Sequence, residues 1–160
     1  MDDLVVALTV IAALGCGLNA GAFFAFSAFV MDALRRLPAA QGIAAMQAIN
    51  VTAVTPAFMG ALFGTAVACI AAIVAGISSW DDSFAPYLVA GGALYVVGPI
   101  GLTIAYHVPR NDALARIDPE HPDGAGYWAR YLVEWTTWNH VRAAAALAAA
   151  ALLTVALVVG

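Results

Sequence analysis

The hydrophobic positions of the chain fall into four long runs, and this pattern predicts four membrane-spanning helices. The runs cover about residues 4–30, 58–77, 87–106 and 140–159. A helix needs about 20 mainly apolar residues to cross the hydrocarbon core of a bilayer, and each run is at least that long. We therefore expect an all-α integral membrane four-helix bundle, with residues 1–160 forming a single domain.

Two of the three connections between these runs are themselves predicted to be helical. Between residues 43 and 53 apolar residues recur at helical spacing, which indicates a short amphipathic helix after the first span, lying at the membrane surface or capping the bundle. Between the third and fourth spans, Asn111 is placed to cap a helix over residues 112–117 that Pro119 ends. From Tyr127 the pattern is helical again and runs into the fourth span.

Small residues in the spans suggest that the helices pack closely together. Gly17 and Gly21 form one G-x-x-x-G pair, and Gly60 and Gly64 form another. Such pairs let helices approach closely in lipid, so this spacing indicates a compact bundle and nothing more specific. Pro99, between two glycines of the third span, is expected to kink that helix.

Composition sets the environment and excludes several classes of protein. The chain is 64% hydrophobic and 10% charged, with a net charge of -4 and no lysine. Soluble domains average about 25% charged residues, and nucleic-acid binders carry a basic face. A soluble domain, a disordered chain and a nucleic-acid-binding protein are therefore excluded, and the lipid bilayer is the expected partner.

The basic residues predict the orientation in the membrane. All six are arginines, and all fall in the first and third connections or at the start of the fourth span: Arg35, Arg36, Arg110, Arg116, Arg130 and Arg142. Arginine-rich connections stay on the cytoplasmic side. We expect a multi-pass cell-membrane protein with these two connections in the cytoplasm and both termini outside.

The polar residues of the spans gather at the arginine-bearing end, where they are candidates for function because polar groups in a bilayer are costly. At 100° per residue, one face of the fourth span carries three aromatic and two polar residues: Tyr131, Trp135, Trp138, Asn139 and Arg142. Such a face suits a flat, partly polar ligand. His140 points to roughly the opposite side.

Structural roles are alternatives for these same residues. Trp128 and Trp135 suit the role of interfacial anchors, because tryptophan gathers at membrane surfaces. Arg142 is also suited to an ion pair with Glu134 or Asp112 that joins two helices. The two cysteines, Cys16 and Cys69, lie in apolar runs and are expected to pack as small hydrophobic residues.

No motif indicates an organic cofactor, since the phosphate-binding, dinucleotide-binding and C-x-x-C patterns are absent. A metal held by His107 and His140 with Asp112, Glu134 or His121 is an open alternative, although no spacing typical of a metal site supports it. We therefore expect neither a metal nor an organic cofactor.

Four segments, in order, resemble the anthrone oxygenase-like family of membrane proteins. They are residues 21–31, residues 42–50 with Pro56 and Phe58, residues 108–114, and the aromatic series from Trp128 to Arg142. The resemblance implies a four-helix integral membrane protein. It also implies an activity, because some relatives oxidise anthrones to anthraquinones with molecular oxygen and no evident organic cofactor.

The resemblance carries over to the polar and aromatic positions of the matching motifs: Asn111, Trp138, Asn139, His140 and Arg142. In the chemistry that it implies, His140 is the base that deprotonates the substrate, and Arg142 and Asn139 stabilise the enolate oxygen. The expected substrate-binding residues are Trp135, Trp138 and Phe24, which would stack on the rings, together with Asn111, His107 and Asn19. The chain departs from the family at His107, where relatives often carry asparagine.

The sequence thus leads to an oxygenase or oxidase of phenolic or anthrone-like aromatic small molecules that uses molecular oxygen. The expected partner is a hydrophobic aromatic small molecule, and a homo-oligomer is an open alternative. A second reading is non-enzymatic, namely a small membrane protein that binds a lipid or quinone or serves a larger complex. Both readings require an enclosed pocket among His107, Asn111, Trp138 and Arg142.

Overall fold

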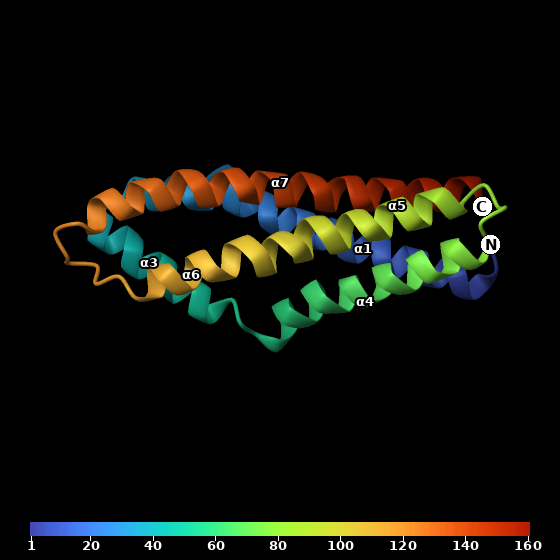
Figure 1. Ribbon diagram of the computed structural model, residues 1–160, viewed down its shortest axis with the longest axis horizontal. Coiled ribbons are helices and arrows are strands. Elements are labelled where there is room, and N and C mark those ends of the chain that lie inside the picture. The colour runs from blue at the N-terminus through green and yellow to red at the C-terminus, as the bar shows by residue number, and fades with distance from the viewer.

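The computed structural model describes residues 1–160, and every regular element in it is helical (Figure 1). The first rod is α1 (Asp3–Ala25), the π-helical η1 (Phe26–Val30) and α2 (Met31–Arg35). Helix α3 (Ala39–Thr52) follows, and α4 (Pro56–Ser78) is the second rod. The third rod joins α5 (Ala85–Tyr95), η2 (Val96–Gly101), η3 (Thr103–His107) and α6 (Val108–Ala115), and α7 (Gly124–Val159) is the fourth.

All four rods are long and apolar enough to cross a membrane, so the prediction of a four-span helical bundle is confirmed. The rods extend beyond the predicted spans, since the third continues as helix to Ala115 and the fourth begins at Gly124. The 36 residues of α7 make a helix about 54 Å long at 1.5 Å per residue. Because a hydrocarbon core is about 30 Å thick, part of α7 stands outside it.

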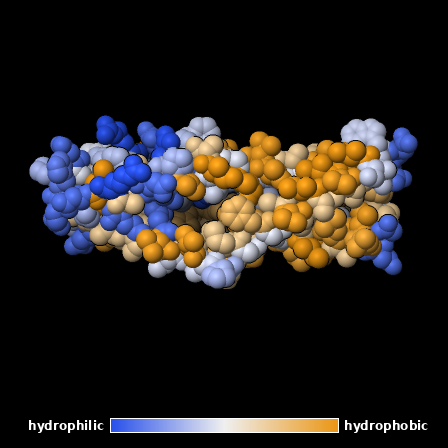
Figure 2. Space-filling view, turned by 60° about the horizontal axis from the view of Figure 1, so that its bottom comes forward, coloured by the Kyte–Doolittle hydropathy of each residue, from blue (hydrophilic) through white to orange (hydrophobic).

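The outer surface of the bundle matches this placement. Large apolar side chains are exposed along the rods, among them Leu14, Val67, Val97 and Leu147. Figure 2 shows a broad hydrophobic zone on one face of the molecule, with hydrophilic residues at both ends. Both termini lie at one end, and α3 and α6 lie at the other (Figure 1). We refer to this second end as the α3 end.

Glycines allow close packing in the bundle, but not at the G-x-x-x-G pairs. Gly17, Gly21, Gly60 and Gly64 face outward, and a Cβ added at any of them would meet nothing within 4 Å. The spacing of these glycines alone does not say how a helix is rotated about its axis. Close contact occurs instead at positions such as Gly92, where a Cβ would lie 2.6 Å from the Cys69 carbonyl oxygen.

Helix α3 packs inside the α3 end and does not lie free on the membrane surface. Ile43 and Met46 are fully buried in a cluster with aromatic residues of α7. Gly42 allows the close approach of Trp128, whose Nε1 would lie 2.7 Å from a Cβ at that position. Trp128 is therefore a core residue and not an interfacial anchor.

The corner between α3 and α4 has a clear local cause. Thr55 caps α4 by accepting a hydrogen bond from the backbone N–H of Phe58 at 3.2 Å. Pro56 occupies the first turn, where its missing N–H costs nothing. The chain therefore turns sharply at residues 53–55 before the second span begins.

The third rod departs from a regular α-helix around Pro99. Two π-helical segments, η2 and η3, carry it from Val96 to His107, which is consistent with a proline that cannot donate the usual hydrogen bond. The helix then continues through Asn111, which lies inside α6. The prediction that Asn111 caps a new helix was thus wrong.

Candidate functional site

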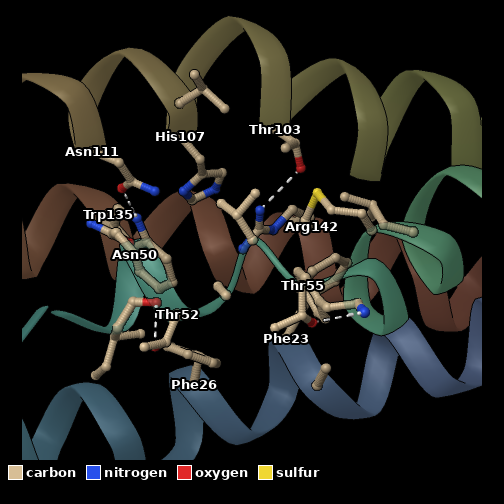
Figure 3. Close-up of a pocket in the computed structure, with 18 of the residues that line it drawn as sticks. Phe23, Phe26, Asn50, Thr52, Thr55, Thr103, His107, Asn111, Trp135 and Arg142 are labelled. Carbon is tan, nitrogen blue, oxygen red and sulfur yellow. Dashed lines mark hydrogen bonds between the residues drawn. The ribbon is translucent and has the colours of Figure 1, made fainter. Parts of the chain in front are cut away.

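A cavity of about 490 Å³ lies at the α3 end, between η1, the α3–α4 corner, the third rod and α7. Its lining is mainly apolar, and its polar residues come from α3, the α3–α4 corner, the third rod and α7 (Figure 3). They include Asn50, Thr103, His107, Asn111 and Arg142. This volume lies in the range of about 300–1,000 Å³ that is usual for small-molecule sites.

The mouth of the cavity is beside the α3–α4 corner. Val54, Phe63 and Val108 line the cavity and are also exposed on the outer surface. Figure 2 shows a recess in this region, where the hydrophilic α3 end meets the hydrophobic zone. The cavity therefore opens sideways, at the level where the bilayer surface is expected.

Arg142 is a buried cation without an acidic partner. It is 8% exposed, and no carboxylate lies within 4.0 Å of it. Its Nε and Nη2 donate to Asn139 Oδ1 at 3.2 and 2.6 Å, and Nη1 donates to Thr103 Oγ1 at 3.0 Å. The guanidinium carbon lies 4.0 Å from the centre of the Phe23 ring. Neutral dipoles and an aromatic face hold this charge, so it is available to an anionic ligand.

The ion-pair alternative for Arg142 was wrong. Glu134 instead lies 3.4 Å from Arg110, and both of these side chains are partly exposed. Asp112 is exposed and forms no ion pair. Arg110 reaches Glu134 from another rod, 24 residues away in the chain, and spacing along a single helix does not show such a contact.

Asn139 orients Arg142. Its Nδ2 donates to the Phe23 carbonyl oxygen and to Ser27 Oγ, each at 2.7 Å, so both amide hydrogens are used within the protein. Its oxygen is then fixed toward the guanidinium. Asn139 does not line the cavity, so it contacts Arg142 from behind and is not placed to donate directly to a ligand in the way that we expected.

His107 is the histidine of the cavity. It is 1% exposed, and neither ring nitrogen has a hydrogen-bond partner in the protein. Its ring packs edge-on against Trp135 with centroids 4.9 Å apart. A buried imidazole that makes no hydrogen bond is costly, and a ligand in the cavity would satisfy it.

Asn111 and Trp135 are locked together at the same end. Asn111 Oδ1 accepts hydrogen bonds from Tyr131 Oη at 2.8 Å and from Trp135 Nε1 at 3.0 Å. Asn111 and Trp135 both line the cavity. Trp135 therefore has a fixed ring and a satisfied N–H.

Four of the expected site residues lie elsewhere. His140 is exposed on the outer face of α7, and Phe24 is 65% exposed. Trp138 is 40% exposed, and its ring packs on that of Tyr106 with the two centroids 5.1 Å apart. Asn19 is buried deeper in the bundle, where its Nδ2 donates to the Gly15 and Ala61 carbonyl oxygens. None of the four lines the cavity, so the pocket expected beside Trp138 lies beside Trp135 instead.

Among the lining residues that were not expected at the site are Phe23, Phe26, Asn50 and Thr103. One signal was available, because Thr103, His107 and Asn111 follow each other at intervals of four residues on the third span. Such an interval places side chains on one face of a helix. No group of three His, Cys, Asp or Glu side chains is arranged to hold a metal ion.

The sequence model of a family described as anthrone oxygenase matches residues 51–152. This match spans 102 of the 160 residues, since 152 − 51 + 1 = 102. The chain belongs to the anthrone oxygenase family. The part that matches this family contains Thr103, His107, Asn111 and Arg142, whereas Phe23, Phe26 and Asn50 of the same cavity precede it. No curated protein and no solved structure matches the chain.

Proposed function

We propose that this protein is a membrane-embedded oxygenase that oxidises phenolic or anthrone-like aromatic molecules with molecular oxygen and needs no metal or organic cofactor. One observation carries the proposal. A buried arginine without a counter-charge faces an apolar, aromatic-lined cavity beside a histidine with two free ring nitrogens. Together these groups suit a ligand that becomes an anion by losing a proton.

In the proposed first step, His107 removes a proton from the benzylic carbon opposite the anthrone carbonyl. The electron pair of the broken C–H bond moves into the ring system and places negative charge on the carbonyl oxygen. Arg142 stabilises this oxygen in a site that excludes water, where a charge interaction is strong. The base role moves from His140 to His107, because His140 is exposed outside the cavity.

In the second step the enolate is oxidised and O2 is reduced. The enolate gives one electron to O2, and the resulting radical and superoxide combine at the benzylic carbon as a peroxide anion. This anion takes back the proton held by His107 and becomes a hydroperoxide. Loss of water from the hydroperoxide leaves a second carbonyl, so anthrone and O2 become anthraquinone and water. The protein supplies a base, a cation and a dry aromatic site, and the oxidant is O2 itself.

The direct test is turnover by purified protein in lipid nanodiscs. With anthrone in air, quinone absorbance should rise faster than in protein-free nanodiscs and should stop rising under argon. The rate should survive treatment with a chelator, and elemental analysis should find no stoichiometric metal. Binding of anthrone without any acceleration in air would contradict the proposal and favour the non-enzymatic reading, a membrane protein that binds quinone-like molecules.

We also propose that the α3 end faces the cytoplasm and that both termini face outward. Five of the six arginines, all except Arg142 inside α7, lie in or near the first and third connections at the α3 end. The native thiols of Cys16 and Cys69 are fully buried, so a single introduced cysteine reports one site. In intact cells, S83C should react with a membrane-impermeant maleimide, and H121C should react only after permeabilisation. The reverse pattern would invert the topology.

A further inference from the structure

Two amide groups at one end of the cavity have hydrogens that no protein group accepts. The Nδ2 atom of Asn50 is buried and has no hydrogen-bond partner. The Nδ2 atom of Asn111 donates to no protein group either, since both hydrogen bonds of that side chain reach its oxygen. Both residues line the cavity (Figure 3). Neither amide has a role in the steps proposed above.

The direction of the Asn111 amide is set by its neighbours. Tyr131 and Trp135 both point a donor at its oxygen, and Trp135 Nε1 is a donor only. Reversing the amide would bring two donor groups together. The Nδ2 atom of Asn111 is therefore the part of the amide without a protein partner, and it presents a hydrogen-bond donor to the cavity.

These donors lie apart from the buried cation. Thr103, which holds Arg142, then His107 and then Asn111 follow one another along the third rod at intervals of four residues (Figure 3). Eight residues of helix separate Thr103 from Asn111, which puts the two ends at most about 12 Å apart along the axis at the α-helical rise of 1.5 Å, since the π-helical η3 rises less per residue. The imidazole lies between them.

A para-quinone fits this spacing. Its two carbonyl oxygens lie roughly 5 Å apart by ordinary bond lengths, and a hydrogen bond of about 2.9 Å at each end extends this to about 11 Å. A mono-ketone of the same shape would engage the cation and leave the amides without a partner. Unpartnered buried donors discriminate strongly between such ligands.

The geometry points to Asn50 and Asn111 as a second oxygen site that binds the oxygen added by the reaction. This inference rests on the proposed function. The original carbonyl oxygen lies at Arg142, the carbon that loses its proton lies near His107, and the new oxygen meets the two amides. The amides then stabilise negative charge on the hydroperoxide and hold the second carbonyl of the product. The site favours molecules with oxygen functions at opposite ends of a fused-ring system.

Equilibrium binding tests this without turnover. Protein in nanodiscs is titrated under argon with anthrone, which has one oxygen, and with anthraquinone, which has two. The native protein should bind the quinone about tenfold more tightly. N50L should remove most of this preference and change the anthrone Kd less than about twofold, because the Nδ2 atom of Asn50 donates no hydrogen bond that the variant would break.

A second variant guards against altered packing. N111D keeps an oxygen for Tyr131 and Trp135 and replaces the donor, so it should also lose the quinone preference. Q41L is the matched control, because it deletes an exposed amide of the same helix, α3, away from the cavity. It should retain the full preference. An equal affinity for both ligands in the native protein, or a preference unchanged in both variants, overturns the inference.

The outcomes separate this inference from the proposed function. If the protein oxidises anthrone rapidly but N50L does not change quinone binding, the proposed oxygenase activity stands and the proposed amide site is contradicted. If the preference for quinone depends on Asn50 but the protein does not oxidise anthrone in air, the proposed amide site stands and the proposed oxygenase activity is contradicted. Failure of both ligands to bind contradicts both.

Discussion

Replacing Arg142 with methionine is expected to abolish most of the oxidation of anthrone while leaving the protein folded. Without the guanidinium the enolate oxygen loses its charge partner, and removing one such stabilising group costs on the order of 10²–10³ in rate. Stability should hold or rise. A buried cation without an acid carries a desolvation cost of several kcal/mol, which offsets the hydrogen bonds lost to Asn139 and Thr103. Turnover in nanodiscs and thermal unfolding in detergent measure the two effects.

The same substitution at Arg110 is the control. Arg110 lies outside the cavity and pairs with Glu134 at 3.4 Å, with both side chains partly exposed. Exposed pairs contribute about 0–1 kcal/mol, so R110M should keep its activity and nearly all its stability. A marked loss of thermal stability in R142M, with activity lost in proportion, would mean that Arg142 joins helices and does not bind a ligand.

Replacing His107 with asparagine should reduce oxidation by about 10²–10⁴, the range expected when a general base is removed. Asparagine is smaller and polar, and it offers a hydrogen bond but cannot take up a proton at neutral pH. The burial of His107 and its two unpartnered nitrogens are the structural basis for this expectation. Initial rates of quinone formation in air measure the loss.

H140N is the matched control, because His140 is the histidine that the sequence favoured and the structure places on the outer face of α7. Its rate should stay within about twofold of the native rate. Activity retained in H107N would show that this position provides a hydrogen bond and not a base, consistent with the asparagine expected in relatives. Activity lost in H140N alone would return the base role to His140.

The sequence predicted the architecture because hydrophobicity decides it. The runs between residues 4 and 159 are too long and too apolar for any other environment, and their order predicts the bundle. The shared face of Tyr131, Trp135, Asn139 and Arg142 also followed from helical periodicity alone, and all four are buried. Local rules were sufficient where one helix sets the geometry.

Hydrophobicity and helical periodicity did not predict which side chains of different helices contact each other. Trp138 lies one residue from Asn139, yet it turns outward because Tyr106 of the third rod packs against it. The cavity also depends on the π-helical turns, which change the face that each following residue presents. Nothing in the composition of α3 showed that it would pack beneath α7 and bring Asn50 to the cavity.

The sideways mouth at the α3–α4 corner has a consequence for how this protein meets its ligands. Flat aromatic molecules partition strongly out of water, so they arrive dissolved in the membrane. The relevant concentration is then the ligand's mole fraction among lipids and not its molarity in the buffer. Adding empty vesicles dilutes such a ligand without changing the total amount in the tube, and half-saturation constants gain meaning only at a stated lipid content.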